Sequence, residues 1–123
     1  MGKERSVANP RRGEVYLVDF DPSRGAEIQK TRPALVIQND IGNQHSPLTI
    51  VAAVTSSVPF RIPAFKILID APEGGLAVDS VVLLNQIRTV DRSRLGRRLG
   101  KLSSRTMARI DEALRISLGL TAI

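Results

Sequence analysis

The apolar residues of this chain fall into short runs, and proline, glycine or a polar turn ends each run. Short runs rich in valine, isoleucine and leucine, bounded by such turn residues, are typical of β-strands. The pattern predicts strands at residues 14–20, 33–38, 48–54, 65–70 and 80–89. A basic, glycine-punctuated segment at 95–102 is predicted as either an edge strand or a loop. The sequence therefore favours five to seven short, mostly antiparallel strands.

One helix is predicted at the C-terminal end. Ser103 or Ser104 can cap its first turn, and Gly119 is a suitable residue to end it. Apolar residues recur every three or four positions between these limits, at Met107, Ile110, Leu114 and Leu118. Such a stripe is typical of a helix that packs one face on a core. The expected fold is mostly β with α, a small antiparallel half-barrel with one helix laid against it.

Length and composition indicate one domain. The chain has 123 residues, and we expect a flexible basic tail at 1–10 followed by a single domain at 11–123. Cysteine is absent, so neither disulfides nor thiolate chemistry is available. No apolar run approaches the roughly 18 residues of a membrane helix, and the N-terminus has no signal-peptide core. These features favour a cytoplasmic protein.

The charge balance is strongly basic. Eighteen Lys and Arg face 12 Asp and Glu, which gives a net charge of +6 and a pI near 10.8. Much of the excess lies between Arg88 and Arg109, where Asp91 is the one opposing acidic residue. Such a run indicates either a polyanionic partner or a solvated basic face. Aromatic residues are only 3%, which argues against base stacking as the main mode of nucleic-acid binding.

Several kinds of catalytic site are excluded by the residues present. His45 is the one histidine, so a two-histidine ribonuclease mechanism is ruled out. The chain has no G-x-S-x-G elbow and no zinc or calcium motif, so we expect no metal and no cofactor. Asp19 and Asp21 form a close carboxylate pair at a predicted turn. Turn capping is the favoured interpretation of this pair, with a Mg²⁺ site as the alternative.

The Arg32-Pro33 pair stands at the end of a long loop, where proline restricts the residue before it to an extended conformation. Other polar residues are predicted on this loop or at strand ends. The candidate set is Arg32, Glu27, Lys30, Thr55, Ser56, Gln86 and Arg88. An arginine can neutralise charge that develops on phosphoryl oxygens, and a hydroxyl can donate to the same oxygens. RNA would supply its own nucleophile through the 2′-hydroxyl.

Four blocks of the chain resemble MazF/PemK-type toxins, and they occur in that family's order and spacing. The blocks are Arg12 to Tyr16, Gly25 to Asp40, Ile50 to Thr55 and Asn85 to Asp91. The resemblance extends from about Arg11 to Leu118. It implies an SH3-like barrel of the PemK/CcdB type and a metal-independent endoribonuclease of a type II toxin–antitoxin system. The implied products carry 2′,3′-cyclic phosphate and 5′-hydroxyl ends.

The resemblance also assigns residues and partners. It implies that Arg32 and Thr55 are catalytic, that Glu27 lies in the substrate loop and that Gln86 lies at a strand end. The residues expected to bind RNA are Arg24, Glu27, Gln29, Lys30, Ser56, Asn85, Gln86 and Arg88. The implied partners are single-stranded RNA, a second copy of the chain in a homodimer and the acidic segment of a MazE-like antitoxin. Two alternatives stay open on the sequence: a CcdB-like gyrase-binding toxin, and a non-catalytic SH3-like module that binds nucleic acid.

Overall fold

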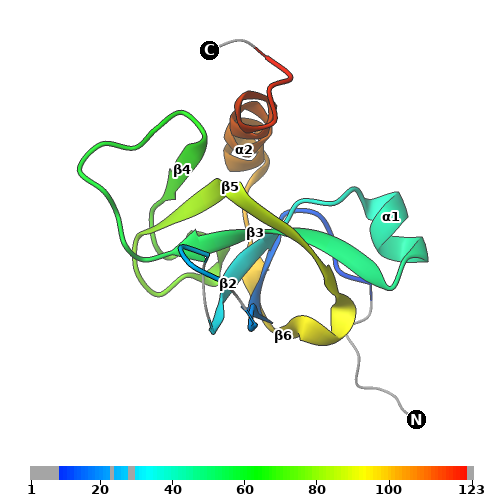
Figure 1. Ribbon diagram of the computed structural model, residues 1–123. Coiled ribbons are helices and arrows are strands. Elements are labelled where there is room, and N and C mark those ends of the chain that lie inside the picture. Colours follow the sequence, from blue (N-terminus) through cyan, green and yellow to red (C-terminus); the bar gives the residue numbers. More distant parts are fainter. Residues whose placement is uncertain (1–8, 23, 28–29, 122–123) are drawn as a thin grey trace.

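Six strands form one antiparallel sheet in the computed structural model, which describes residues 9–22, 24–27 and 30–121 (Figure 1). The strands are β1 Glu14–Asp19, β2 Thr31–Val36, β3 Leu48–Thr55, β4 Lys66–Ile69, β5 Ser80–Asp91 and β6 Leu95–Lys101. Their order across the sheet is β4-β5-β3-β2-β1-β6. Helix α1 spans Asp40–His45, helix α2 spans Ser104–Ser117, and single 3₁₀ turns lie at Glu73–Gly75 and Arg92–Arg94. The predicted antiparallel sheet with a C-terminal helix is confirmed.

The structure resolves two strand boundaries that the sequence left open or placed differently. Residues 95–101 form the edge strand β6, which pairs with β1. Strand β2 begins at Thr31, so Pro33 lies inside it and does not open it as predicted. Pro33 lacks an N–H donor, but it lies just outside the pairing of β2 with β3, which begins at Ala34. Its neighbours Arg32 and Ala34 both pair with β1, so the strand continues through the proline.

Strand β3 is the centre of the sheet, and both of its faces are covered. Alternate side chains enter two apolar clusters, one with Ala52 and Val54 and the other with Val51 and Ala53. The first cluster packs against α2. The second lies on the opposite face, and we refer to that side as the second face. A strand that is buried on both faces has a continuous apolar sequence, and residues 48–54 show this pattern.

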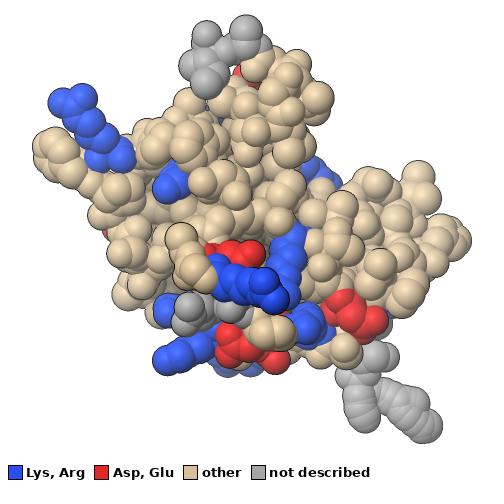
Figure 2. Space-filling model, in the orientation of Figure 1, with Lys and Arg blue, Asp and Glu red and all other residues tan. Residues whose placement is uncertain are grey.

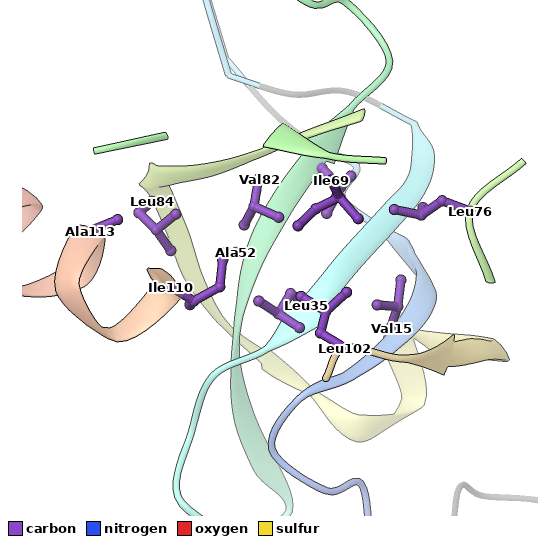
Figure 3. Packing of buried hydrophobic residues seen from close by; sticks show 11 residues of the cluster. Val15, Leu35, Ala52, Ile69, Leu76, Val82, Leu84, Leu102, Ile110 and Ala113 are labelled. Atoms are coloured by element: carbon purple, nitrogen blue, oxygen red, sulfur yellow. The ribbon is translucent and has the colours of Figure 1, made fainter. Parts of the chain in front are cut away.

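Helix α2 lies against β4 and β5. The hydroxyl oxygen of Ser103 accepts a hydrogen bond from the N–H of Thr106 at 3.1 Å, which caps the helix at the first of the two predicted residues. Figure 3 shows Ile110 and Ala113 directed toward the sheet residues of the first cluster. Leu118 was predicted in the apolar stripe, but it is the C-cap residue and is 52% exposed, because the last turn projects beyond the sheet (Figure 1).

The segment before β1 is held by Arg12. Its Nε donates to the carbonyl of Ile37 at 2.8 Å, and its Nη2 donates to Asp111 of α2 at 2.7 Å. Pro10 is buried. Residues 1–8 of the predicted tail lie outside the described residues. Arg12 therefore links the chain before β1 to the end of β2 and to the C-terminal helix.

Tyr16 of β1 is buried beside the edge strand. Its hydroxyl donates to Glu14 Oε1 at 2.9 Å, and Arg98 of β6 pairs with Oε2 of the same carboxylate at 2.9 Å. Burial, reinforced by the neighbouring Glu14, raises the pKa of Tyr16 to about 12. The phenol of Tyr16 therefore stays neutral in the folded state at pH values at which an exposed tyrosine ionises.

We expect Ile110→Ala to lower the free energy of unfolding by about 3 kcal/mol, because the side chain is fully buried between α2 and the sheet. Urea unfolding followed by circular dichroism measures the change, at one fixed protein concentration. Arg105→Ala on the exposed side of α2 is the control and should change the value by less than about 0.5 kcal/mol. Equal effects of the two substitutions would contradict the packing of α2 on the sheet.

We expect tyrosinate absorbance to appear only near pH 12 in the folded protein. The chain has one tyrosine and no tryptophan, so the signal reports Tyr16 alone. The unfolded phenol ionises near pH 10. Between about pH 10 and pH 12 the unfolded state therefore loses a proton that the folded state keeps, and stability falls as the pH rises through this window. A folded-state midpoint near pH 10 would contradict the buried Tyr16–Glu14 hydrogen bond.

Candidate active site

Arg32 and Thr55 come from neighbouring strands of the sheet. The pairing of β2 with β3 ends at Ala34 opposite Ala53. Arg32 and Thr55 each lie two residues beyond this pair, and because the strands are antiparallel they stand at the same end of the two neighbouring strands. Side chains alternate along a strand, so Arg32 and Thr55 extend from the same face as Ala34 and Ala53, which is the second face. Arg32 is exposed and lies opposite Val18 of β1 on its other side.

The hydroxyl of Thr55 has a defined orientation. Its Oγ1 accepts a hydrogen bond from the N–H of Ser57 at 3.1 Å. A hydroxyl that accepts in this way keeps its own hydrogen to donate elsewhere. Thr55 is therefore arranged as a donor beside an exposed arginine, and these are the two functions that stabilise a phosphoryl group in transfer.

A cavity of about 570 Å³ opens on the same face of the sheet. It is lined by Phe20, Ala26, Glu27, Ala53, Asn85, Gln86, Ile87 and Arg88. Four of the predicted RNA-binding residues thus lie together in its wall. Arg32 and Thr55 are not among the described lining residues, but Thr55 follows the lining residue Ala53 by two positions on β3. In Figure 2 charged atoms of both signs gather around a hollow in the middle of the face shown, while the surface above is mostly uncharged.

An irregularity in β5 shapes one wall of this cavity. Ala52 pairs with Ile87 whereas the next residue, Ala53, pairs with Leu83, so Leu84, Asn85 and Gln86 have no opposite residues on β3. Extra residues of this kind bend a strand and redirect its side chains. The sequence predicted Gln86 and Arg88 at the end of a strand. They lie inside β5, and the bulge is what brings Asn85 and Gln86 to the cavity.

The connection from β1 to β2 forms the opposite wall, and hydrogen bonds close its base. The N–H of Phe20 donates to the carbonyl of Lys30 at 3.0 Å, and the N–H of Lys30 donates to Asp21 Oδ1 at 2.9 Å. Asp19 Oδ1 accepts from the N–H of Asp21 at 3.0 Å. Both carboxylates therefore cap backbone groups, as the turn-capping interpretation predicts. Among the described residues, no group of three or more His, Asp or Glu side chains could hold a metal ion.

Two arginines bind the carbonyl groups at the base of the same connection. Arg88 donates through Nη1 to the carbonyl of Phe20 at 2.6 Å and through Nη2 to the carbonyl of Pro22 at 3.4 Å. Arg94 donates through Nη1 to the carbonyls of Asp19 and Asp21. Arg88 was predicted to contact RNA, and its described contacts are with the protein's own backbone.

Several arginines of the basic run between residues 88 and 109 therefore bind groups within the protein itself. Arg92 donates to the carbonyls of Asn43 and Ser46, and Arg98 pairs with Glu14. Together with Arg88 and Arg94, at least half of the eight cations between residues 88 and 109 have partners within the protein. The interpretation that this run binds a polyanion therefore does not apply to every cation in it.

The remaining predicted residues take different places. Glu27 Oε1 accepts a hydrogen bond from the N–H of Arg24, so these two residues form a small turn in the loop. Lys30 is exposed, and Ser56 is exposed directly after Thr55. Gln29 lies outside the described residues. His45 is exposed at the end of α1.

Sequence analysis missed three kinds of contributor to this site. Phe20, Ala53 and Ile87 line the cavity but read as ordinary core residues of strands. Arg94 was one cation among eight, and no local signal separates it from its neighbours. The bulge in β5 could not be found from a continuous apolar run, because the irregularity exists only in the pairing with β3.

Known proteins resemble this chain in sequence and in structure. Residues 11–118 match the family model of the PemK-like, MazF-like toxin of type II toxin–antitoxin systems. Endoribonuclease EndoA of Bacillus subtilis (strain 168) is 47% identical over 110 residues, which cover 89% of this chain and 95% of that protein.

Solved structures of endoribonucleases and MazF proteins are similar to this chain in fold. An endoribonuclease from a mycobacterial species, in complex with its cognate antitoxin, superposes with a TM-score of 0.77 at 25% identity and covers 93% of this chain and 99% of its own. MazF (Form-I) from Deinococcus radiodurans has a TM-score of 0.76 at 30% identity, covering 89% of this chain and 96% of that one.

Lys30 adopts a left-handed backbone conformation, with φ of 65°. This conformation costs a β-branched residue more than it costs glycine. We therefore expect Lys30→Gly to keep or slightly raise stability and Lys30→Val to lower the free energy of unfolding by about 1 kcal/mol. Thermal unfolding checks both. Equal destabilisation by glycine and valine would show that the side chain, not the backbone, matters at this position.

Proposed function

This chain belongs to the PemK-like and MazF-like toxins of type II toxin–antitoxin systems and is an endoribonuclease, and from that premise we propose that Arg32 and Thr55 catalyse the cleavage of single-stranded RNA. The observation that carries the proposal is the register of β2 against β3: Arg32 and Thr55 each lie two residues beyond the Ala34–Ala53 pair, at the same end of the two strands and on the face that carries the cavity. The gyrase-binding and non-catalytic alternatives are not favoured, because the relatives named above are endoribonucleases or MazF toxins.

The proposed reaction is an in-line attack by the ribose 2′-hydroxyl on the adjacent phosphorus. The 2′-oxygen loses its proton and bonds to phosphorus while the bond to the 5′-oxygen breaks, and the leaving 5′-oxygen takes up a proton. The products are a 2′,3′-cyclic phosphate and a 5′-hydroxyl end. Arg32 neutralises the charge that develops on the non-bridging oxygens, and the hydroxyl of Thr55 donates to the same oxygens.

Arginine is suited to charge stabilisation rather than to proton abstraction. Its guanidinium keeps its proton at any physiological pH, and it donates to two oxygens of a phosphate at once. Pro33 and the pairing of Arg32 with Val18 of β1 hold the backbone of Arg32 in an extended conformation. The cation is therefore presented from a rigid strand, which favours a preorganised site.

The cavity is the proposed binding place for bases of the RNA. Asn85 and Gln86 carry amides that both donate and accept, as base edges require, and Glu27 adds an acceptor across the cavity. Arg24, Gln29, Lys30 and Ser56 are proposed to contact the RNA around this centre, with Gln29 outside the described residues. The 2′-hydroxyl nucleophile restricts the reaction to RNA.

The proposed partners follow from the family and the charge. Antitoxin complexes are known for the mycobacterial endoribonuclease and for MazF of Deinococcus radiodurans. We propose that this chain forms a homodimer and that an acidic segment of a MazE-like antitoxin covers the RNA-binding surface of this basic protein. None of the helices in the described part of the chain is long and apolar enough to cross a membrane. A cytoplasmic location is proposed, since messenger RNA is the expected substrate.

We expect Arg32→Ala to lower kcat by at least about a hundredfold and Thr55→Val to lower it by about tenfold or more, because each removes a group that acts on the phosphoryl oxygens. Cleavage of a single-stranded RNA oligonucleotide, resolved on a denaturing gel, measures the rates. Arg105→Ala is the matched control, since it removes an exposed arginine of α2. Circular dichroism confirms folding. A fully active Arg32→Ala protein would refute the assignment.

The in-line mechanism makes a second, chemical prediction. A substrate with 2′-deoxyribose on the 5′ side of the scissile bond should resist cleavage completely, and EDTA should leave the rate on the all-RNA substrate unchanged. Sequencing of the new 5′-hydroxyl ends from a mixed RNA also gives the cleavage motif. Cleavage of the deoxy-substituted substrate would exclude the 2′-hydroxyl as nucleophile.

A further inference from the structure

The connection between β1 and β2 is held at four consecutive carbonyl groups by two arginine side chains. Arg88 binds the carbonyls of Phe20 and Pro22, and Arg94 binds those of Asp19 and Asp21. We propose that this arginine clamp, defined as Arg88, Arg94 and the carbonyls of residues 19–22, positions the substrate-binding wall of the cavity. The proposal rests on the RNA-cleaving function above and makes Arg88 and Arg94 positioning residues.

The two arginines reach the connection from one continuous segment. Arg88 lies in β5, two residues beyond the bulge that supplies Gln86 to the cavity. Arg94 ends the 3₁₀ turn that follows β5 directly. Asp91 fixes that turn, because its Oδ1 accepts the N–H of Ser93 at 2.9 Å. The clamp therefore ties the β1–β2 wall of the cavity to the segment that forms its other wall.

The two arginines bind their carbonyls in different ways. Arg88 uses two nitrogens of its planar guanidinium, Nη1 and Nη2, for carbonyls that are two residues apart, which the single nitrogen of a lysine ammonium does not reproduce, whereas Arg94 binds both of its carbonyls through Nη1. Hydrogen bonds from a charged donor are shorter and stronger than neutral ones. The Arg88–Phe20 bond at 2.6 Å is partly buried, which shields it from competing water.

The competing role for Arg88 is direct contact with an RNA phosphate, as predicted from the sequence. The two roles differ in what the free protein shows. A clamp acts before RNA arrives, so its loss changes the β1–β2 connection in the absence of RNA. A phosphate contact acts only in the complex, where its loss reduces the salt dependence of binding.

The test compares Arg88→Gln, Arg88→Lys and Arg94→Gln with Arg105→Gln, which changes an exposed arginine of α2. Hydrogen exchange in the RNA-free protein is followed at the backbone amides of Phe20 and Lys30, which close the base of the connection. We expect exchange about tenfold faster or more in Arg88→Gln, Arg88→Lys and Arg94→Gln and unchanged exchange in the control. Lysine should fail to rescue at position 88, since Arg88 binds through two nitrogens of the guanidinium fork.

Steady-state cleavage supplies the second readout. The clamp variants should raise KM about tenfold while kcat stays within about threefold of the native value, because Arg32 stays paired with Val18 and Thr55 with Val81 in the sheet. The slope of log KM against log salt should stay as in the native protein. Should one variant fail to fold, as judged by circular dichroism, the corresponding variant of the other arginine decides the test.

Two results would overturn the proposal. Unchanged amide exchange in folded Arg88→Gln and Arg94→Gln proteins would show that the carbonyl contacts do not hold the connection. Full rescue of KM by lysine with a salt slope altered by about one in the glutamine variants would assign both arginines to phosphate contacts. If the native protein cleaves no RNA, the proposed function fails, and the exchange measurement still decides whether the clamp exists.

Discussion

The pairing of β3 with both of its neighbours is the constraint on which the rest of this structure depends. On one side, its pairing with β2 ends at Ala34 opposite Ala53, which leaves Arg32 and Thr55 at the same end of two neighbouring strands. On the other side, its register with β5 shifts by three residues between Ala52 and Ala53, and the resulting bulge turns Asn85 and Gln86 into the cavity. One buried strand therefore aligns the proposed catalytic pair and the proposed base-binding residues, and a slip in its register would separate them.

The basic character of the chain has a structural use as well as a proposed functional one. Arg88, Arg92 and Arg94 each bind two backbone carbonyls, and Arg12 binds one carbonyl and one carboxylate. These contacts fasten connections that have few apolar residues of their own. Loops that bind a substrate need support from a rigid scaffold. In this protein arginine provides much of that support, so a high net charge alone does not measure the RNA-binding surface.

The strands and the helix could be predicted because their signals are local. The apolar runs, the turn residues and the Ser103 cap each lie within a few positions of the element that they define. The site was predictable in a different way, through the motif resemblance that assigned Arg32 and Thr55. The role of Arg88 was not, because its partners Phe20 and Pro22 lie more than sixty residues earlier in the chain, and no local pattern encodes that contact.

The sequence by itself determined the elements, their order and the residue types available for chemistry: one histidine, no cysteine and an arginine fixed before a proline. Only the tertiary structure decided which of those residues meet. The position of Arg32 and Thr55 at the same end of two neighbouring strands, the bulge behind Asn85 and Gln86, and the binding of Arg94 to the β1–β2 connection all arise from contacts between distant segments. Strand register and side-chain reach across the sheet are set by the packing of both faces at once, and a local stretch of sequence does not contain that information.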